Sequence, residues 1–262
     1  MKSYCLASSS SGNCFIFEFD INGMPTRIMV ECGISIAEIR RKLGELGIML
    51  SSIRACLITH AHGDHCKCAK DIQRYGIPLF ASKETLEQVS CSGSELIPLE
   101  PKRVLNGLFV MGFEVKHDID GALGFIIKTK DECVFFANDH KKWEDNLSNF
   151  RPNYVFIECN YDHKTVYAQY GELQRERKGL VESHQNTKEV DIKLKQHERN
   201  INSHCSLAGT IRGLEKLNLS KTICIFLMHL SDRYANEYLM KNTIQDKFRI
   251  KTYVCRKLGG ID

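Results

Sequence analysis

The sequence predicts a single domain of the α/β class, and three observations support this prediction. The chain has 262 residues, a length that α/β folds often form as one unit. Short apolar runs separated by turn residues fill its first two-thirds, and segments with apolar residues at helical spacing lie between them. The hydrophobic fraction of 43% and the charged fraction of 26% are ordinary for a globular protein. We therefore expect residues 1–262 to form one domain.

The elements are expected in the following order. An early hairpin has strands at 14–20 and 26–31, joined by an Asn-Gly-Met-Pro turn. Apolar runs predict further strands at 52–60, 77–82, 107–117, 121–130, 133–139, 153–160, 221–230 and 249–258. Apolar residues at helical spacing predict helices at 36–48, 68–76 and 235–248.

A polar, highly charged segment at about 164–203 interrupts this pattern. Its composition predicts one or two solvent-facing helices, or a lid, inserted into the domain. Its cations would suit the guidance of a nucleic-acid backbone, and they include Arg175, Arg177, Lys178, Lys193 and Lys195. Acidic residues are interspersed among them, so a solvated helix face fits the same composition.

Charge and cysteine content limit the class of protein. The net charge of +4 neither demonstrates nor excludes a polyanionic partner. Several of the 12 cysteines lie in strand-like apolar runs, where free cysteine behaves as a small buried hydrophobe. We therefore expect reduced thiols and a cytoplasmic location. No apolar run is long enough to span a bilayer, so no membrane partner is expected.

The most informative motif is His-Ala-His-Gly-Asp-His at residues 60–65, directly after an apolar run. On a turn, His60 and His62 would face one metal ion, and Asp64 and His65 would face a second. Imidazole and carboxylate together suit Zn²⁺ and comparable divalent ions. A histidine-rich surface loop is the alternative, but four potential ligands within six residues disfavour it.

Further ligands must come from other strand ends. His117, Asp139 and His229 each end an apolar run. Sites often collect where strands end, and the two oxygens of Asp139 suit a position between two metals. Taken alone, a histidine at a strand end is more often a surface or structurally satisfied residue. The adjacent histidine-rich motif shifts the interpretation towards metal binding.

These motifs resemble a known family. The run THAHGDH resembles the signature of the metallo-β-lactamase superfamily. Further segments between residues 4 and 236 resemble the YycJ/WalJ-type branch of this superfamily. They are LASSSSGN, ECGIS, HDIDGALGF, FANDH, FIECNYDH, NINSHCSLA and MHLSDRYAN. The stretch HLSDRY also resembles tRNase Z-type nucleases. The resemblance implies a four-layer αββα sandwich with two divalent metal ions, Zn or Mn, at one edge of its two sheets.

The resemblance also implies roles for individual residues. It assigns one metal to His60, His62 and His117, the other to Asp64, His65 and His229, and places Asp139 between them. Its catalytic group comprises Asp64, His204 as proton donor and Glu158 as the partner that orients His204. From the residues alone, a surface or helix-capping role for His204 and an ordinary salt bridge for Glu158 stay open.

Two features depart from the family pattern. Residue 31 is Glu where relatives usually carry Asp, and Cys66 and Cys68 follow the signature. The Cys-Lys-Cys spacing is too tight for a usual zinc pair, so helix packing is the preferred interpretation of both thiols.

Substrate contacts are predicted at Ser11 and Asn13, in a small polar loop, and at Arg233. Amides and hydroxyls of such a loop can cradle phosphate oxygens, and a guanidinium can pair with phosphate. A tight turn without ligand and a solvated surface charge are the respective alternatives.

The chemistry that follows is phosphodiester hydrolysis. Two metals that share a water lower its pKa, and the resulting hydroxide attacks phosphorus. The branch resemblance implies a DNA exonuclease, with nucleic acid as partner. The alternatives are a phosphodiesterase acting on a cyclic nucleotide, as in the anti-Pycsar enzymes of this fold, and a non-catalytic metal-binding scaffold. A homodimer is expected because dimers are common among such relatives.

Overall fold

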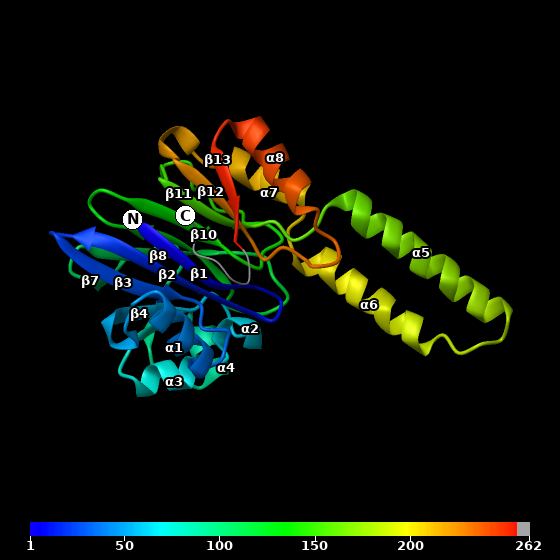
Figure 1. Ribbon diagram of the computed structural model, residues 1–262, viewed down its shortest axis with the longest axis horizontal. Helices are drawn as coiled ribbons and strands as arrows, with labels where there is room; N and C mark the ends of the chain where they lie inside the picture. The colour runs from blue at the N-terminus through cyan, green and yellow to red at the C-terminus, as the bar shows by residue number, and fades with distance from the viewer. Residues whose placement is uncertain (256–262) are drawn as a thin grey trace.

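Two β-sheets lie face to face in the computed structural model, which describes residues 1–255, and helices cover their outer faces (Figure 1). The first sheet has the strand order β1-β2-β3-β4-β5-β6, and the second has the order β13-β12-β11-β10-β9-β8-β7. This arrangement is the four-layer αββα sandwich that the sequence resemblance implied.

The first sheet comes from the N-terminal part of the chain. Its strands are β1 (Lys2–Ser9), β2 (Gly12–Ile21), β3 (Met24–Val30), β4 (Ile53–Leu57), β5 (Leu79–Ala81) and β6 (Ser94–Glu95). The helical elements of this half are α1 (Ile36–Glu45), η1 (Leu50–Ser52), α2 (Gly63–Cys66), α3 (Ala69–Arg74) and α4 (Lys83–Val89). The strands β3 to β6 run parallel, so β3 and β4 end at the same edge of the sheet.

The second sheet follows. Its strands are β7 (Lys102–Leu105), β8 (Leu108–Glu114), β9 (Leu123–Lys128), β10 (Cys133–Ala137), β11 (Tyr154–Glu158), β12 (Cys224–Met228) and β13 (Lys251–Val254). The helical elements near this sheet are α7 (Leu207–Glu215), η2 (Leu219–Lys221) and α8 (Glu237–Phe248). Parallel pairing of β10, β11 and β12 brings their carboxyl ends to one edge.

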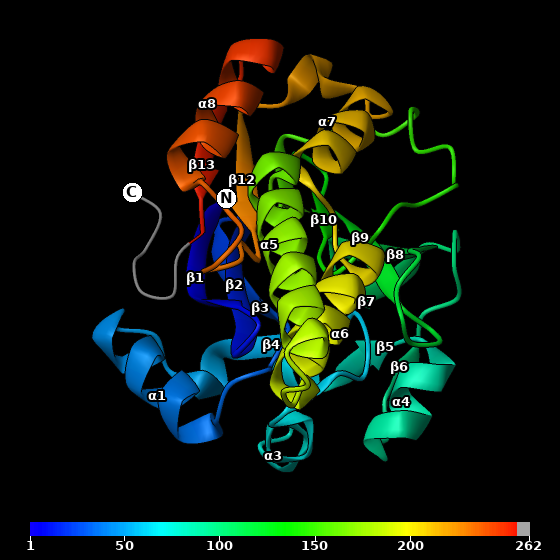
Figure 2. The ribbon, with the colours of Figure 1, turned by 90° about the vertical axis from the view of Figure 1, so that its right-hand side faces the viewer.

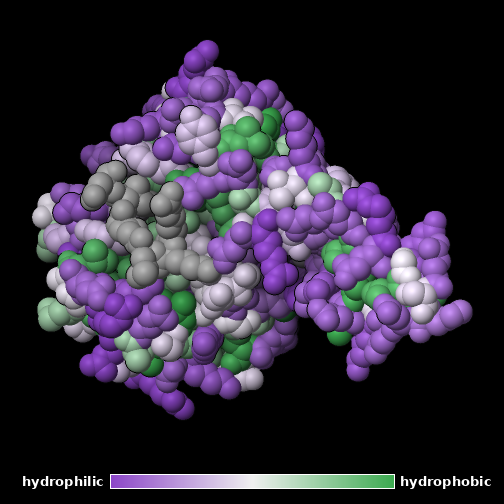
Figure 3. Space-filling model, turned by 45° about the vertical axis from the view of Figure 1, so that its right-hand side comes forward, coloured by the Kyte–Doolittle hydropathy of each residue, from purple (hydrophilic) through white to green (hydrophobic). Residues whose placement is uncertain are grey.

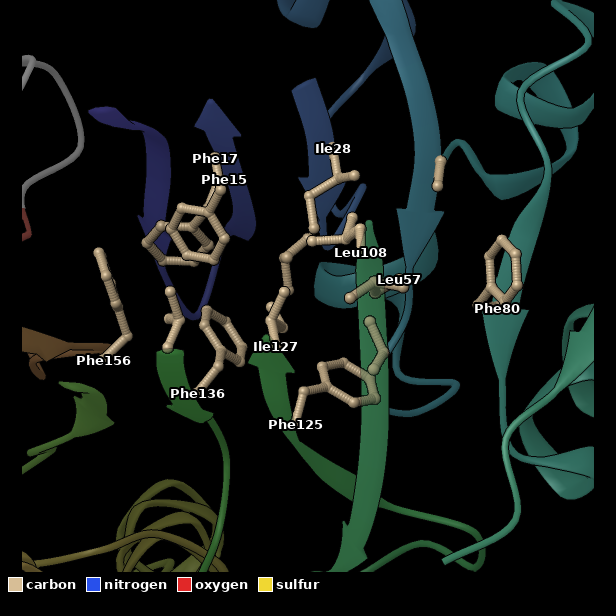
Figure 4. Packing of buried hydrophobic residues seen from close by; sticks show 14 of the residues in the cluster. Phe15, Phe17, Ile28, Leu57, Phe80, Leu108, Phe125, Ile127, Phe136 and Phe156 are labelled. Atoms are coloured by element: carbon tan, nitrogen blue, oxygen red, sulfur yellow. The ribbon is translucent and has the colours of Figure 1, made fainter. Parts of the chain in front are cut away.

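Aromatic side chains fill the space between the sheets (Figure 4). Phe15 on β2 meets Phe136 on β10 with ring centroids 5.4 Å apart, and Phe17 meets Phe156 on β11 at 4.8 Å. Ile16, which points to the opposite face of β2, packs in the layer of α1 and α3 instead. Because β2 is buried on both faces, its sequence is a nearly continuous apolar run and does not alternate between apolar and polar residues.

The helices α5 (His163–Glu182) and α6 (Lys188–Ser203) form a hairpin, here called the arm, that projects from the sandwich (Figures 1 and 2). These helices occupy the segment for which the sequence predicts one or two solvent-facing helices. Only Val166 of α5 and Val190, His197 and Ser203 of α6 are buried. Figure 3 shows a largely hydrophilic arm surface with a small apolar patch.

Several boundaries differ from the sequence prediction. The strand expected at 52–60 ends at Leu57, because Thr59 and His60 turn towards the edge of the sheets. The helices α4 and α7 were not predicted, although Ser82 and Ser206 cap their N-termini through side-chain hydrogen bonds. Of the strand expected at 249–258, β13 accounts for 251–254, and 256–258 lie outside the described residues. Among residues 1–255, no helix is long and apolar enough to cross a membrane.

Candidate metal centre

The candidate ligands lie on loops and on the short helix α2 at the shared edge of the two sheets. His60 and His62 follow β4, Asp139 follows β10 and His229 follows β12. Asp139 and His229 have φ values of 45° and 54°, in the left-handed region that residues other than glycine rarely adopt. Backbone strain of this kind is often retained where a side chain must be aimed at a functional site.

The first group of candidate ligands contains three histidines, as the sequence predicts. His62 Nδ1 lies 3.0 Å from His60 Nε2 and 3.2 Å from His117 Nε2. The ligand atoms of the three residues all lie within 4.8 Å of one another. Three imidazole nitrogens that converge in this way match the ligand set of many zinc sites.

A second group contains Asp64, His65, Asp139 and His229, whose ligand atoms also lie within 4.8 Å of one another. His65 Nε2 lies 3.4 Å from Asp64 Oδ2, and His229 Nε2 lies 3.7 Å from the same oxygen. This group combines two carboxylates with two imidazoles, a donor set suited to a divalent ion.

Asp139 reaches both groups. Its Oδ2 lies 3.2 Å from His65 Nε2 and 3.9 Å from His117 Nε2, and its Oδ1 lies 3.4 Å from His229 Nε2. The position between the groups therefore agrees with that expected for a carboxylate shared by two metals.

Partners on the far side of the rings orient His60 and His65. His60 Nδ1 lies 2.9 Å from Thr59 Oγ1, and His65 Nδ1 lies 3.2 Å from Glu31 Oε1. Thr59 Oγ1 donates a hydrogen bond to Glu31, which is fully buried and has a φ of 65°. A carboxylate or hydroxyl at the outer nitrogen fixes the ring and directs the other nitrogen towards a metal.

Other groups contact the outer nitrogens of His117 and His229. His117 Nδ1 lies 3.2 Å from the backbone oxygen of Ser203, at the end of α6. His229 Nδ1 lies 3.0 Å from the side-chain amide of Asn160. In both residues Nε2 is the nitrogen that faces the candidate ligand groups.

Two buried atoms test whether a metal fits here. Asp139 Oδ1 and His229 Nε2 have no hydrogen-bond partner among the described residues. Buried polar atoms are costly without a partner, and a coordinated cation would supply one to each. The buried donor set of nitrogen and oxygen atoms thus fits a pair of divalent ions.

Electrostatics agree with this fit. Burial opposes a charged imidazole, yet Asp139 and Glu31 raise the pKa of His65 well above its usual value. Burial likewise opposes a charged Asp139, yet His229 and His65 hold the pKa of its carboxyl well below its usual value. The carboxylates of the site therefore attract positive charge, which protons supply in the absence of metal.

Buried Glu158 pairs with the partly exposed His204 beside the second group. Glu158 Oε1 lies 2.6 Å from His204 Nδ1, and the His140 amide donates a 2.8 Å hydrogen bond to Oε2. Burial opposes protonation of His204, but Glu158 dominates and raises its pKa to about 9. The His204 ring stacks on His229 with ring centroids 5.0 Å apart. Glu158 therefore favours the protonated form of an imidazole that lies next to the candidate metal ligands.

A cavity of about 630 Å³ opens over this edge. Its wall includes ten residues of the turns and strand ends: Ser10, His62, Gly63, Asp64, His117, Asp139, His204, His229, Ser231 and Arg233. Arg233, for which the sequence predicts a substrate contact, thus lines the same cavity as the candidate ligands.

Ser11 and Asn13 are not brought to this cavity wall, whereas Ser10 is. Asn13 is fully buried, and its amide nitrogen lies 3.3 Å from the backbone oxygen of Asp64 and 3.2 Å from His65 Nε2. Asn13 is therefore placed to fix helix α2, which carries Asp64 and His65, rather than to contact a substrate.

Sequence reasoning missed the contribution of α6. Gln196, Arg199 and Asn200 line the same cavity. Each is an ordinary polar residue of a charged helix, so the sequence carried no signal for them. Cys66 and Cys68 belong to none of the candidate metal-ligand groups found among residues 1–255.

Asp162 and His163, which the sequence places near Glu158, do not line this cavity. Asp162 caps α5 by accepting a hydrogen bond from the Thr165 amide. His163 is exposed and stacks on Tyr167. Both residues therefore shape the start of the arm.

Comparisons with known proteins identify the family of the chain. A family profile described as a beta-lactamase superfamily domain matches residues 26–225. The chain is 26% identical over 169 residues to exodeoxyribonuclease WalJ of Streptococcus pneumoniae. This match covers 60% of the chain and 61% of the relative, so it spans less than two-thirds of the relative's length.

Two solved structures share the fold. The metallo-β-lactamase fold protein YhfI from Bacillus subtilis has a TM-score of 0.68 and 13% identity, with 99% of this chain and 97% of that chain covered. The short form of human tRNase Z has a TM-score of 0.61 and 12% identity, with 100% and 99% covered. At these identities the likeness concerns the fold alone.

Proposed function

Because the chain belongs to the β-lactamase superfamily, we propose that it is a hydrolase that uses two divalent metal ions, zinc or manganese, to cleave phosphodiester bonds at the end of a DNA strand. The observation that carries the proposal is the Glu158–His204 pair beside the candidate metal ligands. The name of the pneumococcal relative, an exodeoxyribonuclease, supports the choice of DNA.

The seven candidate ligands are proposed to hold the two ions in the arrangement implied by the sequence. His60, His62 and His117 would bind one ion, Asp64, His65 and His229 the other, and Asp139 both. When bound, such ions supply an activated water and neutralise charge on the phosphate.

The protein's own residues supply the remaining steps. A nucleotide leaving group departs as an alkoxide, which is a poor leaving group unless it receives a proton. His204 holds that proton, and Glu158 fixes the ring and stabilises its positive charge. Arg233, on the cavity wall, pairs with a phosphate oxygen.

A cyclic-nucleotide phosphodiesterase is the competing proposal, because a cavity of about 630 Å³ is large enough for a single nucleotide. A non-catalytic scaffold is less well supported, since all seven candidate ligands are present at the shared sheet edge. The cytoplasmic location and a homodimer stay predictions.

A substrate panel tests the proposal. Protein loaded with Mn²⁺ or Zn²⁺ is incubated with 5′-phosphorylated DNA, RNA, cyclic mononucleotides, a chromogenic aryl phosphodiester, a lactam and a thioester. We expect mononucleotide release from DNA and hydrolysis of the aryl diester. Hydrolysis of the lactam or thioester with no hydrolysis of any phosphodiester would overturn the proposal. If the protein hydrolyses cyclic mononucleotides only, the substrate is a cyclic nucleotide and not DNA.

A further inference from the structure

The arm reaches the candidate active site with its own base. Gln196, Arg199 and Asn200 lie in the last two turns of α6 and line the cavity above the candidate ligands. Figures 1 and 2 show the rest of the arm extending away from the sheets. The base of α6 is thus a wall of the site.

Two contacts fix this wall to the loop that carries His117. Arg199 Nε donates a 2.9 Å hydrogen bond to Asp118 Oδ2, and the Ser203 backbone oxygen lies 3.2 Å from His117 Nδ1. Asp118 Oδ1 in turn lies 3.1 Å from His117 Nε2. The guanidinium of Arg199 is therefore tied to the rim of the candidate metal centre.

The ion pair of Arg199 with Asp118 leaves hydrogen-bond donors of the guanidinium available to a ligand. Asp118 engages Nε, and the two terminal nitrogens make no hydrogen bond within residues 1–255. The Arg199 side chain is 67% exposed. A guanidinium presents its donors in a planar fork, so its free edge suits the paired oxygens of a phosphate.

Three other cations of the arm pair with carboxylates of the arm itself. Arg177 pairs with Asp191 at 2.6 Å, and Lys193 pairs with Glu189 at 2.7 Å. None of the five cations singled out from the sequence lines the cavity, whereas Arg199 does. Among the arm cations, Arg199 is therefore the one that lines the cavity.

Arg233 supplies a second guanidinium to the same cavity. Two bound divalent ions would neutralise charge on the phosphate that is cleaved, so a substrate with only one phosphate would need few further cations. A nucleic-acid strand carries a phosphate at every nucleotide and gains from each additional pairing.

We propose that Arg199, held in place by Asp118, and Arg233 bind the phosphate next to the scissile one, so that the site selects a strand with consecutive phosphates over a single nucleotide. This inference rests on the proposed phosphodiesterase function. Arg199 and Arg233 act as substrate-binding residues, and Asp118 acts as a positioning residue.

The test compares kcat/KM for a 5′-phosphorylated DNA oligonucleotide with kcat/KM for an aryl phosphodiester that has one phosphate. Arg199→Ala should lower the ratio of the two values about tenfold, the loss expected for one charge-assisted hydrogen-bonding contact. The matched control is Arg175→Ala, because Arg175 lies on α5 and does not line the cavity. The control should leave the ratio unchanged.

Binding provides an independent readout. With a phosphorothioate oligonucleotide that resists hydrolysis, Arg199→Ala should reduce the slope of log affinity against log salt by about 0.7, the value for one lost contact on a single strand. Asp118→Asn should lower the kinetic ratio in the wild-type background but not in Arg199→Ala, because a positioning residue acts only through its partner.

An unchanged ratio and salt slope in Arg199→Ala would overturn the inference while leaving the phosphodiesterase proposal intact. Wild-type protein that cleaves cyclic mononucleotides but no oligonucleotide would also overturn the inference. If the wild-type protein cleaves no phosphodiester at all, the proposed function itself fails.

Discussion

The substitution Glu158→Gln tests the proton donor while preserving the shape of the site. Glu158 is fully buried, with Oε1 2.6 Å from His204 Nδ1, and glutamine has nearly the same size. The substitution removes the negative charge that keeps His204 protonated. Burial is then opposed by Asp139 alone, so the pKa of His204 should fall from about 9.

The size of the effect follows from this change. A pKa near 9 instead of the usual 6.5 favours the charged imidazole by roughly 3 kcal/mol. A pKa of about 9 favours the charged His204 ring at pH 7 in the wild-type protein, and we expect Glu158→Gln to shift the ring towards the neutral form. Loss of a positioned proton donor lowers a rate by about 10² to 10⁴-fold. We expect a loss of kcat in that range on DNA.

The assay uses two leaving groups. A DNA strand releases an alkoxide that needs a proton, whereas an aryl phosphodiester releases a phenolate that leaves without one. Glu158→Gln should therefore impair DNA hydrolysis far more than aryl diester hydrolysis, with metal content unchanged. The alkaline decline of the DNA rate should also move to lower pH. Glu172→Gln, at an exposed position of α5, is the matched control. Equal losses on both substrates at full metal content would refute the role of His204 as proton donor.

Two further predictions concern metal binding and stability. Asp139→Ala removes the carboxylate that reaches both ligand groups, so elemental analysis should find fewer than two metals per chain; unchanged metal content would contradict the proposed ligand set. Burial opposes the charge of Glu18, but Lys2 and Arg27 lower the pKa of its carboxyl group. The charged carboxylate therefore stabilises the fold at pH values above its unfolded-state pKa of about 4.3. This stabilisation is lost as the pH falls through the lower folded-state pKa. Glu18→Gln should therefore cost about 1 kcal/mol in urea unfolding at pH 7 and nothing in strong acid, and a pH-independent cost would contradict this reasoning.

The sequence alone predicted the features that depend on residues close together in the chain. The four potential ligands at 60–65 are local, and the apolar runs before His117, Asp139 and His229 are readable because strand burial repeats over a few residues. The resemblance to the metallo-β-lactamase superfamily then implied the αββα sandwich, which the structure confirmed.

Residues that support the candidate ligands had no such signal. Thr59, Asn160 and Glu31 are ordinary polar residues in the sequence, and the structure alone shows which histidine each one contacts. Asn13 was interpreted as a substrate contact because a serine-rich loop resembles a phosphate cradle, but its amide lies buried against the Asp64 turn.

The arm was predictable as helical and charged, but its relation to the site was not. Helical composition does not specify which polar residue faces solvent and which faces a cavity on a distant loop. That choice depends on how α6 packs against the loop after β8, as in the contact of Arg199 with Asp118, 81 positions earlier in the chain. Contacts between such distant segments form only when the whole chain has folded, and local patterns in the sequence do not encode them.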